Sequence, residues 1–65
     1  MLYIIEVFSG EHPPYNMSMS KYTDKNDALH AYHQKRQEAD AVWVSLMEWK
    51  DNCGQLIFSG WCNQN

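Results

Sequence analysis

The chain has 65 residues, a formal net charge of −3, three tryptophans, four tyrosines and two phenylalanines. A chain of this length forms one small domain that buries only about 60% of its unfolded surface, so it needs an aromatic core, an oligomer, a metal or disulfides. Of its five basic residues only Lys35 and Arg36 are adjacent. This dispersal argues against the clustered basic face that binds a nucleic-acid backbone.

We expect neither a membrane-spanning segment nor a signal peptide in this chain. No apolar run approaches the roughly 18 residues that span a bilayer. Residues 1–8, "MLYIIEVF", lack the basic region of a signal peptide, and Glu6 interrupts their apolar run. We therefore expect a cytoplasmic protein with no membrane contact.

The two cysteines, Cys53 and Cys62, are expected to be free thiols. If residues 51–54, "DNCG", form a turn, roughly eight residues of strand separate the two thiols by about 28 Å. A disulfide requires Cα atoms within about 7 Å. Two cysteines without further ligands at metal-binding spacing also predict no zinc site.

The first half of the chain predicts two strands. Residues 2–8 carry apolar side chains on both alternating faces, which is typical of a central strand. Gly10 and the pair Pro13–Pro14 end this strand. Residues 15–21 alternate strictly between apolar and polar, as a half-buried edge strand does. In this interpretation the side chains that face the core are Tyr15, Met17 and Met19, and those that face solvent are Asn16, Ser18 and Ser20.

A helix is predicted over residues 24–38. Thr23 or Asp24 can cap its first turn, and Lys35 and Arg36 fall where the helix dipole is negative. A modest apolar arc consists of Ala28, Leu29, Ala31, Tyr32 and Ala39.

A β-hairpin is predicted over the second half. Residues 41–50 form a strand that is apolar on both faces, residues 51–54 form the turn, and residues 55–61 return. The expected opposite pairs are Met47–Phe58, Trp49–Leu56 and Val44–Trp61.

These elements predict an α+β fold of the ββαββ type. The two strands that are apolar on both faces need interior positions, which gives a four-stranded antiparallel sheet of order 2-1-3-4. One helix covers one face of this sheet, so an apolar patch remains exposed, and such a patch marks an interface. Met and aromatic residues there are either gap-filling core or an adaptable recognition surface. The candidates for contact with a partner or a second copy are Tyr15, Met17, Trp43, Met47, Trp49 and Phe58.

Catalytic and metal motifs are not found in the sequence. His30 and His33 lie near Asp27 on the predicted helix, but a metal site needs at least three converging ligands. No Gly-x-Ser-x-Gly, P-loop or dinucleotide-binding pattern occurs. Cys53 beside a histidine could act as a nucleophile, but a domain this small seldom encloses a catalytic cavity. We therefore expect no metal, no cofactor and no enzymatic activity.

The segment "YTDKNDA" at the helix start, followed by "VWVSLMEWKDNCG", resembles a pattern that recurs in small phage-encoded accessory proteins. Some proteins of that group inhibit host enzymes or antiviral defence. The resemblance covers roughly residues 15–60, implies an inhibitor or sequestering protein, and transfers no site residues.

Three functions follow as hypotheses. The first is a non-enzymatic protein that inhibits or modulates a partner protein, as a homodimer or higher oligomer. The alternative is an oligomeric sponge for a small nucleotide signal at a subunit interface, where an aromatic ring stacks on the base. Its phosphate contacts would come from Lys35, Arg36 or Lys50. The third is a structural accessory subunit.

Overall fold

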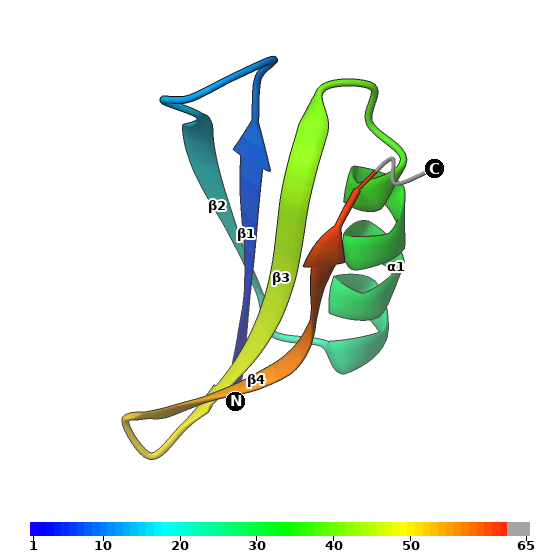
Figure 1. Cartoon of the computed structure of the whole chain (residues 1–65). Helices are drawn as coiled ribbons and strands as arrows, with labels where there is room; N and C mark the ends of the chain where they lie inside the picture. The colour runs from blue at the N-terminus through cyan, green and yellow to red at the C-terminus, as the bar shows by residue number, and fades with distance from the viewer. Residues whose placement is uncertain (63–65) are drawn as a thin grey trace.

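A computed structural model describes residues 1–62, in which one helix packs against one face of a four-stranded antiparallel sheet (Figure 1). The strand order is β2-β1-β3-β4. This confirms the predicted ββαββ fold and the predicted order. The elements are β1 (Leu2–Ser9), β2 (Asn16–Tyr22), α1 (Lys25–Arg36), β3 (Ala41–Lys50) and β4 (Cys53–Trp61).

The core lies between α1 and the two central strands. Ile5 on β1 pairs with Leu46 on β3, and both side chains are fully buried. Val44 on β3 is equally buried, and Ala28 lets the helix approach because its side chain is a single methyl group. The remaining members of this cluster include Tyr3, Val7, Tyr32, Ala41 and Cys62. Every large aliphatic residue in the cluster therefore comes from β1 or β3.

The helix is shorter at its C-terminus than the predicted 24–38. Asp24 is the N-cap, and its carboxylate accepts a hydrogen bond from the amide of Asn26 at 3.1 Å. The helix ends at Arg36, where the amide of Gln37 donates to the carbonyl of Gln34 at 3.1 Å. This tighter bond closes the last turn without a glycine.

The predicted facing of the second strand is wrong. Ser18 and Ser20 lie opposite Val7 and Ile5, on the side that α1 covers. Met17 and Met19 therefore point to the other side, where they are 53% and 50% exposed. Alternation shows which residues share a face, but the buried residues of β1 and β3 decide which face the helix covers. Tyr15, just before β2, is also exposed.

The hairpin turn is shorter than the predicted 51–54. Asp51 and Asn52 both have positive φ values, 54° and 63°, and Lys50 lies opposite Cys53. A two-residue turn with two positive φ values suits the twist of antiparallel strands, and Asn and Asp tolerate that conformation. Cys53 and Gly54 consequently belong to β4.

The shorter turn and a bulge in β4 together overturn the predicted hairpin pairs. The two-residue turn places Met47 opposite Leu56, and the register then shifts between Met47 and Leu46, so Leu46 lies opposite Phe58. Ile57 is the extra residue, and its side chain packs against the core. In place of the predicted pair Trp49–Leu56, Trp49 lies opposite Gly54. In place of the predicted pair Val44–Trp61, Val44 lies opposite Gly60 and Trp61 lies opposite Trp43.

Two leucines that occupy opposite environments provide a test of this core. Leu46→Ala should lower the free energy of unfolding by about 2–5 kcal/mol, because Leu46 is 0% exposed. That loss is comparable with the total stability of so small a domain. The matched change Leu56→Ala should cost well under about 1 kcal/mol, because Leu56 is 55% exposed. Urea unfolding followed by circular dichroism at submicromolar protein measures both; equal losses would contradict this core.

Candidate interaction surface

The side of the sheet opposite α1, which we call the open face, carries most of the predicted contact residues. Its members follow from the strand registers, because directly opposite residues of antiparallel strands share a face. They are Leu2, Ile4, Glu6 and Phe8 on β1, Met17, Met19 and Lys21 on β2, Trp43, Ser45, Met47 and Trp49 on β3, and Gly54, Leu56 and Ser59 on β4.

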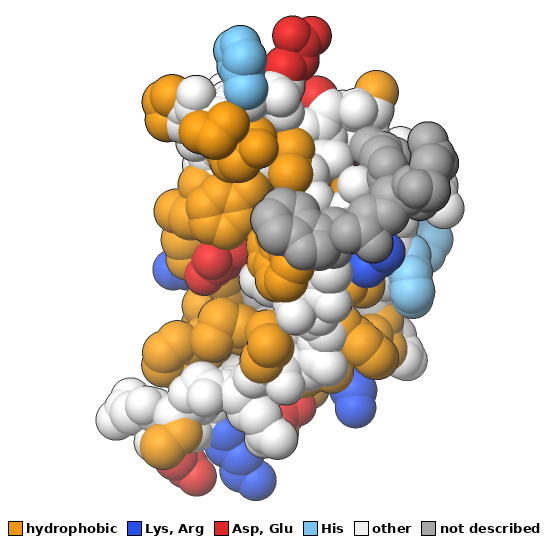
Figure 2. Space-filling model, viewed as in Figure 1, with side chains coloured by type: hydrophobic (Ala, Val, Ile, Leu, Met, Phe, Trp, Pro, Cys, Tyr) orange, Lys and Arg blue, Asp and Glu red, His pale blue; other side chains and the backbone are white. Residues whose placement is uncertain are grey.

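The open face is largely apolar, and no element of the described chain covers it. Met17, Met19 and Leu56 are each at least half exposed, while Trp43 and Met47 are partly buried by their neighbours. Figure 2 shows hydrophobic side chains spread over the strands on the side of the molecule that faces the viewer. Contiguous apolar surface of this kind is characteristic of a contact site.

A polar band spans β1, β3 and β4 on the open face and ends at Met19 on β2. Glu6 on β1 lies opposite Ser45 on β3, which lies opposite Ser59 on β4. In Figure 2 an acidic side chain lies between the upper and lower hydrophobic groups. Within residues 1–62, Glu6 takes part in no ion pair and in no side-chain hydrogen bond. The carboxylate therefore retains its full capacity to accept hydrogen bonds from a partner.

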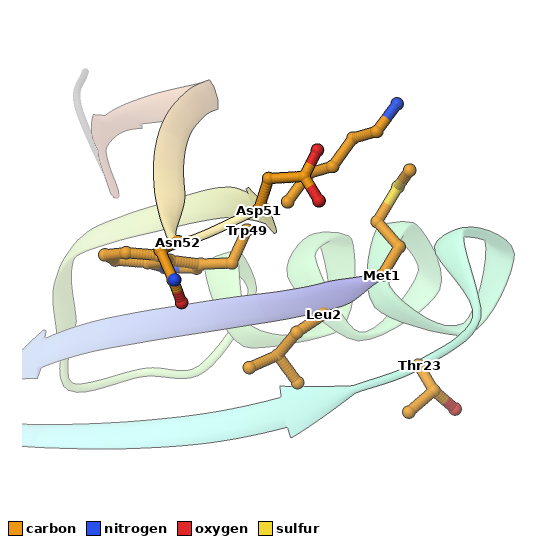
Figure 3. Close-up of a pocket in the computed structure, with 7 residues that line it drawn as sticks. Met1, Leu2, Thr23, Trp49, Asp51 and Asn52 are labelled. Carbon is orange, nitrogen blue, oxygen red and sulfur yellow. The ribbon is translucent and has the colours of Figure 1, made fainter.

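One end of the open face has a cavity of about 620 Å³ beside Trp49 (Figure 3). A Cβ atom on Gly54, the residue opposite Trp49, would lie 2.9 Å from the indole ring. Gly54 is thus the residue that lets this ring lie over β4. The Nε1 atom of Trp49 is buried and has no hydrogen-bond partner among the described residues. The other residues that line the cavity are Met1, Leu2, Thr23, Lys50, Asp51 and Asn52.

The other end of the open face has a wholly apolar cavity of about 300 Å³. Phe8 and Trp43, which lie opposite each other, form one part of its wall, and Tyr15 and Val42 complete it. A register shift after Phe8 leaves Val42 as an extra residue in β3. Each end of the open face therefore contains a hollow with a tryptophan in its wall.

The structure brings together four of the six predicted contact residues. Met17, Trp43, Met47 and Trp49 share the open face, and Tyr15 lies at its end. The prediction was wrong to place Phe58 on that face with Trp43 and Met47. Its ring lies on the helix side, with its centroid 5.7 Å from that of the Tyr32 ring on α1.

Sequence analysis did not predict Leu2, Phe8 and Leu56 as contact residues. The alternation in residues 2–8 already groups Leu2 with Phe8 and could have identified them. Leu56 was given the wrong partner because the turn spans two residues rather than the predicted four, and Phe58 the wrong face because the bulge at Ile57 has no evident signal in the sequence. The opposition of Glu6 to Ser45 follows only from the register of β1 with β3.

The three predicted phosphate contacts do not converge within one chain. Lys35 lies 3.9 Å from the carboxylate of Glu38, and Arg36 donates to the hydroxyl of Tyr32 at 3.0 Å. That hydrogen bond raises the pKa of Arg36. Lys50 ends β3 at the hairpin, at the opposite end of the molecule from the last turn of α1 (Figure 1).

The described residues form neither a metal-binding cluster nor a membrane-spanning helix. Within residues 1–62, no three His, Cys, Asp or Glu side chains come together in a way that could hold a metal ion. The single helix of the described chain is too short and too polar to cross a membrane.

No protein-family model, curated protein or solved structure matches this chain.

The two cysteines are both free, as predicted, and differ in exposure: Cys53 is exposed and Cys62 is buried. Burial raises the pKa of the Cys62 thiol, and the positive charge of Arg36 offsets part of that rise. A buried thiol with a raised pKa is a poor nucleophile.

Alkylation rates test this difference in the native protein. At pH about 8, iodoacetamide should modify Cys53 within minutes and Cys62 at least tenfold more slowly, because only the thiolate reacts and Cys62 is shielded. Mass spectrometry of the time course measures both rates. Because the pKa of Cys62 is raised in the folded state, stability should fall as the pH rises above about 8.5, where the unfolded thiol ionises first. Equal rates at the two thiols would contradict the burial of Cys62.

Proposed function

We propose that this protein is a non-enzymatic binding protein that inhibits or modulates a partner protein through its open face. The observation that carries the proposal is a sheet face with large apolar side chains that the single helix leaves uncovered. Covering apolar surface stabilises a complex by about 25 cal/mol for each Å² removed from water. A target with a complementary apolar surface therefore gains most of its affinity here.

The composition and relief of the open face support this function. Trp and Met are enriched at protein interfaces, where aromatic anchors in pockets contribute much of the affinity. Trp43 and Trp49 lie beside the two hollows, one at each end, so the face can receive projecting side chains at two points. Residues 15–60 resemble small phage-encoded accessory proteins, some of which inhibit host enzymes or antiviral defence, and this supports a host enzyme or a defence protein as the target.

Site-specific photocrosslinking tests this function in the cells that produce the protein. A benzophenone amino acid at Met17, on the open face, should crosslink one defined protein target. The same amino acid at Gln34, on the exposed side of α1, should not crosslink it. Adding Met19→Asp should abolish the crosslink at residue 17, because a charge then opposes the apolar target surface.

The control for that charge is His30→Asp, which adds a carboxylate to an exposed site on α1 and should leave the crosslink at residue 17 intact. Crosslinking of the same proteins from residues 17 and 34, or a crosslink that survives Met19→Asp, would refute binding through the open face.

A second candidate function is the sequestration of a small nucleotide signal. The cavity beside Trp49 favours it, because a cavity of this size suits a small ligand and both Trp49 and Lys50 line it. The ring would stack on the base and Lys50 would contact phosphate. A second subunit would have to bring in Lys35 or Arg36.

A thermal-shift panel of linear and cyclic nucleotides tests this second function. One class of nucleotide should raise the melting temperature by several degrees, and Lys50→Gln should remove that shift because the phosphate loses its charged donor. Lys35→Gln should weaken the shift only if a second subunit completes the site. A panel with no shift above the buffer baseline would exclude this function.

A further inference from the structure

The open-face residues of the two central strands are matched in polarity across the β1–β3 pairing. Glu6 lies opposite Ser45, so the polar residue of each strand meets the polar residue of the other. The other open-face pairs are Leu2–Trp49, Ile4–Met47 and Phe8–Trp43, and all of them are apolar. The two central strands therefore have the same pattern of polarity on the open face, whereas the outer strands differ, with Met19 in the row of Ser59 and Lys21 in the row of Leu56.

A surface with this symmetry is complementary to itself. Consider a two-fold axis that runs parallel to the strands, in the plane of contact, above the line between β1 and β3. It lays β1 of one chain over β3 of the other, so each residue faces the copy of its own cross-strand partner. Ile4 then faces Met47 of the partner subunit, and Glu6 faces Ser45 of the partner subunit. Such a contact is isologous, as in most closed dimers.

We propose that a second copy of this chain covers the open face, in a two-fold dimer in which Glu6 accepts a hydrogen bond from Ser45 of the partner subunit. The axis keeps the strands of the two sheets nearly parallel, which is the aligned packing of β-sandwiches. At the rim Lys21 faces Leu56 of the partner subunit, where its aliphatic stem can pack while the ammonium stays in water.

The polar band selects this axis over the perpendicular one. An axis across the strands, centred between the Ile4–Met47 and Glu6–Ser45 pairs, would lay Glu6 over Ile4 of the partner subunit. A carboxylate buried against an aliphatic side chain without a hydrogen bond is strongly unfavourable. The same axis moved onto the polar band would bring the two Glu6 carboxylates together, where like charges repel. Only the axis parallel to the strands therefore gives Glu6 a donor.

The size of the open face sets the strength of the dimer. Four strands about 4.8 Å apart and a length of about 25 Å give an outline of about 500 Å² for each chain. Stable interfaces bury at least about 600 Å² for each partner, so this contact lies near the lower limit. We therefore expect a reversible dimer with a micromolar dissociation constant. The inference rests on the proposed function in one respect, since the second copy shields the same face that the target binds.

Sedimentation velocity over a micromolar concentration series tests the dimer without any target. The native chain should pass from monomer to dimer, and Met47→Asp should weaken the dimer at least tenfold by placing a carboxylate against Ile4 of the partner subunit. Gln34→Asp on α1 should leave the dimer unchanged. A chain that stays monomeric throughout the series would overturn the proposal.

The Glu6–Ser45 contact has its own test. Ser45→Ala should weaken the dimer about tenfold or more, because the Glu6 carboxylate is then buried without its donor. Adding Glu6→Leu should restore dimerisation to at least the native level, because both polar partners are then gone. Circular dichroism confirms the fold of each variant. If Ser45→Ala leaves the dimer unchanged, or the double variant fails to recover, this contact is refuted.

Crosslinking distinguishes the two axes. In a background with Cys53→Ser and Cys62→Ala, a bismaleimide linker with a reach of about 10 Å bridges cysteines on facing sheets. Mixing a Met19→Cys chain with a Ser59→Cys chain should give a crosslinked dimer, because these positions face each other across the proposed axis. Mixing Met19→Cys with Lys21→Cys should not, whereas the perpendicular axis requires that product.

The outcome for the dimer is independent of the outcome for the target. A monomeric chain whose residue 17 still crosslinks a protein target keeps the proposed function and loses only the self-association. A dimer with no target at residue 17 keeps the self-association and loses the proposed function.

Discussion

A single twelve-residue helix against a four-stranded sheet is the constraint on which the rest of this structure depends. A helix of that length covers one face, so the chain builds one core and leaves one face open. The core uses the aliphatic pairs Ile5–Leu46 and Val7–Val44 from the two central strands. The same two strands carry large apolar residues on their other side, where the described chain has nothing to bury them. Stability therefore rests on one face of these strands, and the proposed binding uses the other.

Two backbone features of β4, a bulge and a glycine, shape the two faces of the β3–β4 hairpin. The bulge at Ile57 turns two consecutive β4 side chains, Ile57 and Phe58, toward the helix side. It enlarges the core at the edge of the sheet without lengthening the strand. Gly54 serves the open face in the complementary way, because its missing side chain makes room for the ring of Trp49. A bulge also twists an edge strand, which hinders unwanted pairing at the β4 edge.

The sequence was sufficient to predict the elements and their order, because these depend on strong local signals. Strands apolar on both faces had to be central, and the pair Thr23–Asp24 marked the start of the helix, which Asp24 caps. The sequence was insufficient to predict which face of a strand is buried, because that depends on packing between elements. Met17 and Met19 alternate as a buried strand does, yet the buried residues of β1 and β3 determine which face the helix covers. The wrong hairpin register began at the turn, which has two residues instead of the predicted four. The wrong facing of Phe58 has a second cause, since one unpaired residue at Ile57 reverses the facing of everything beyond it.

In the proposed function, the polar band on the open face is what makes the contact specific. An unbroken apolar face would pack against any apolar surface in many orientations, whereas a buried carboxylate needs a donor at one position. Glu6 therefore adds little affinity, but it penalises every arrangement that fails to supply a hydroxyl or a cation opposite it. In the proposed dimer Ser45 of the partner subunit supplies that donor. A protein target that displaces the second copy must supply one too, so the target surface should be apolar at both ends with a hydrogen-bond donor between them.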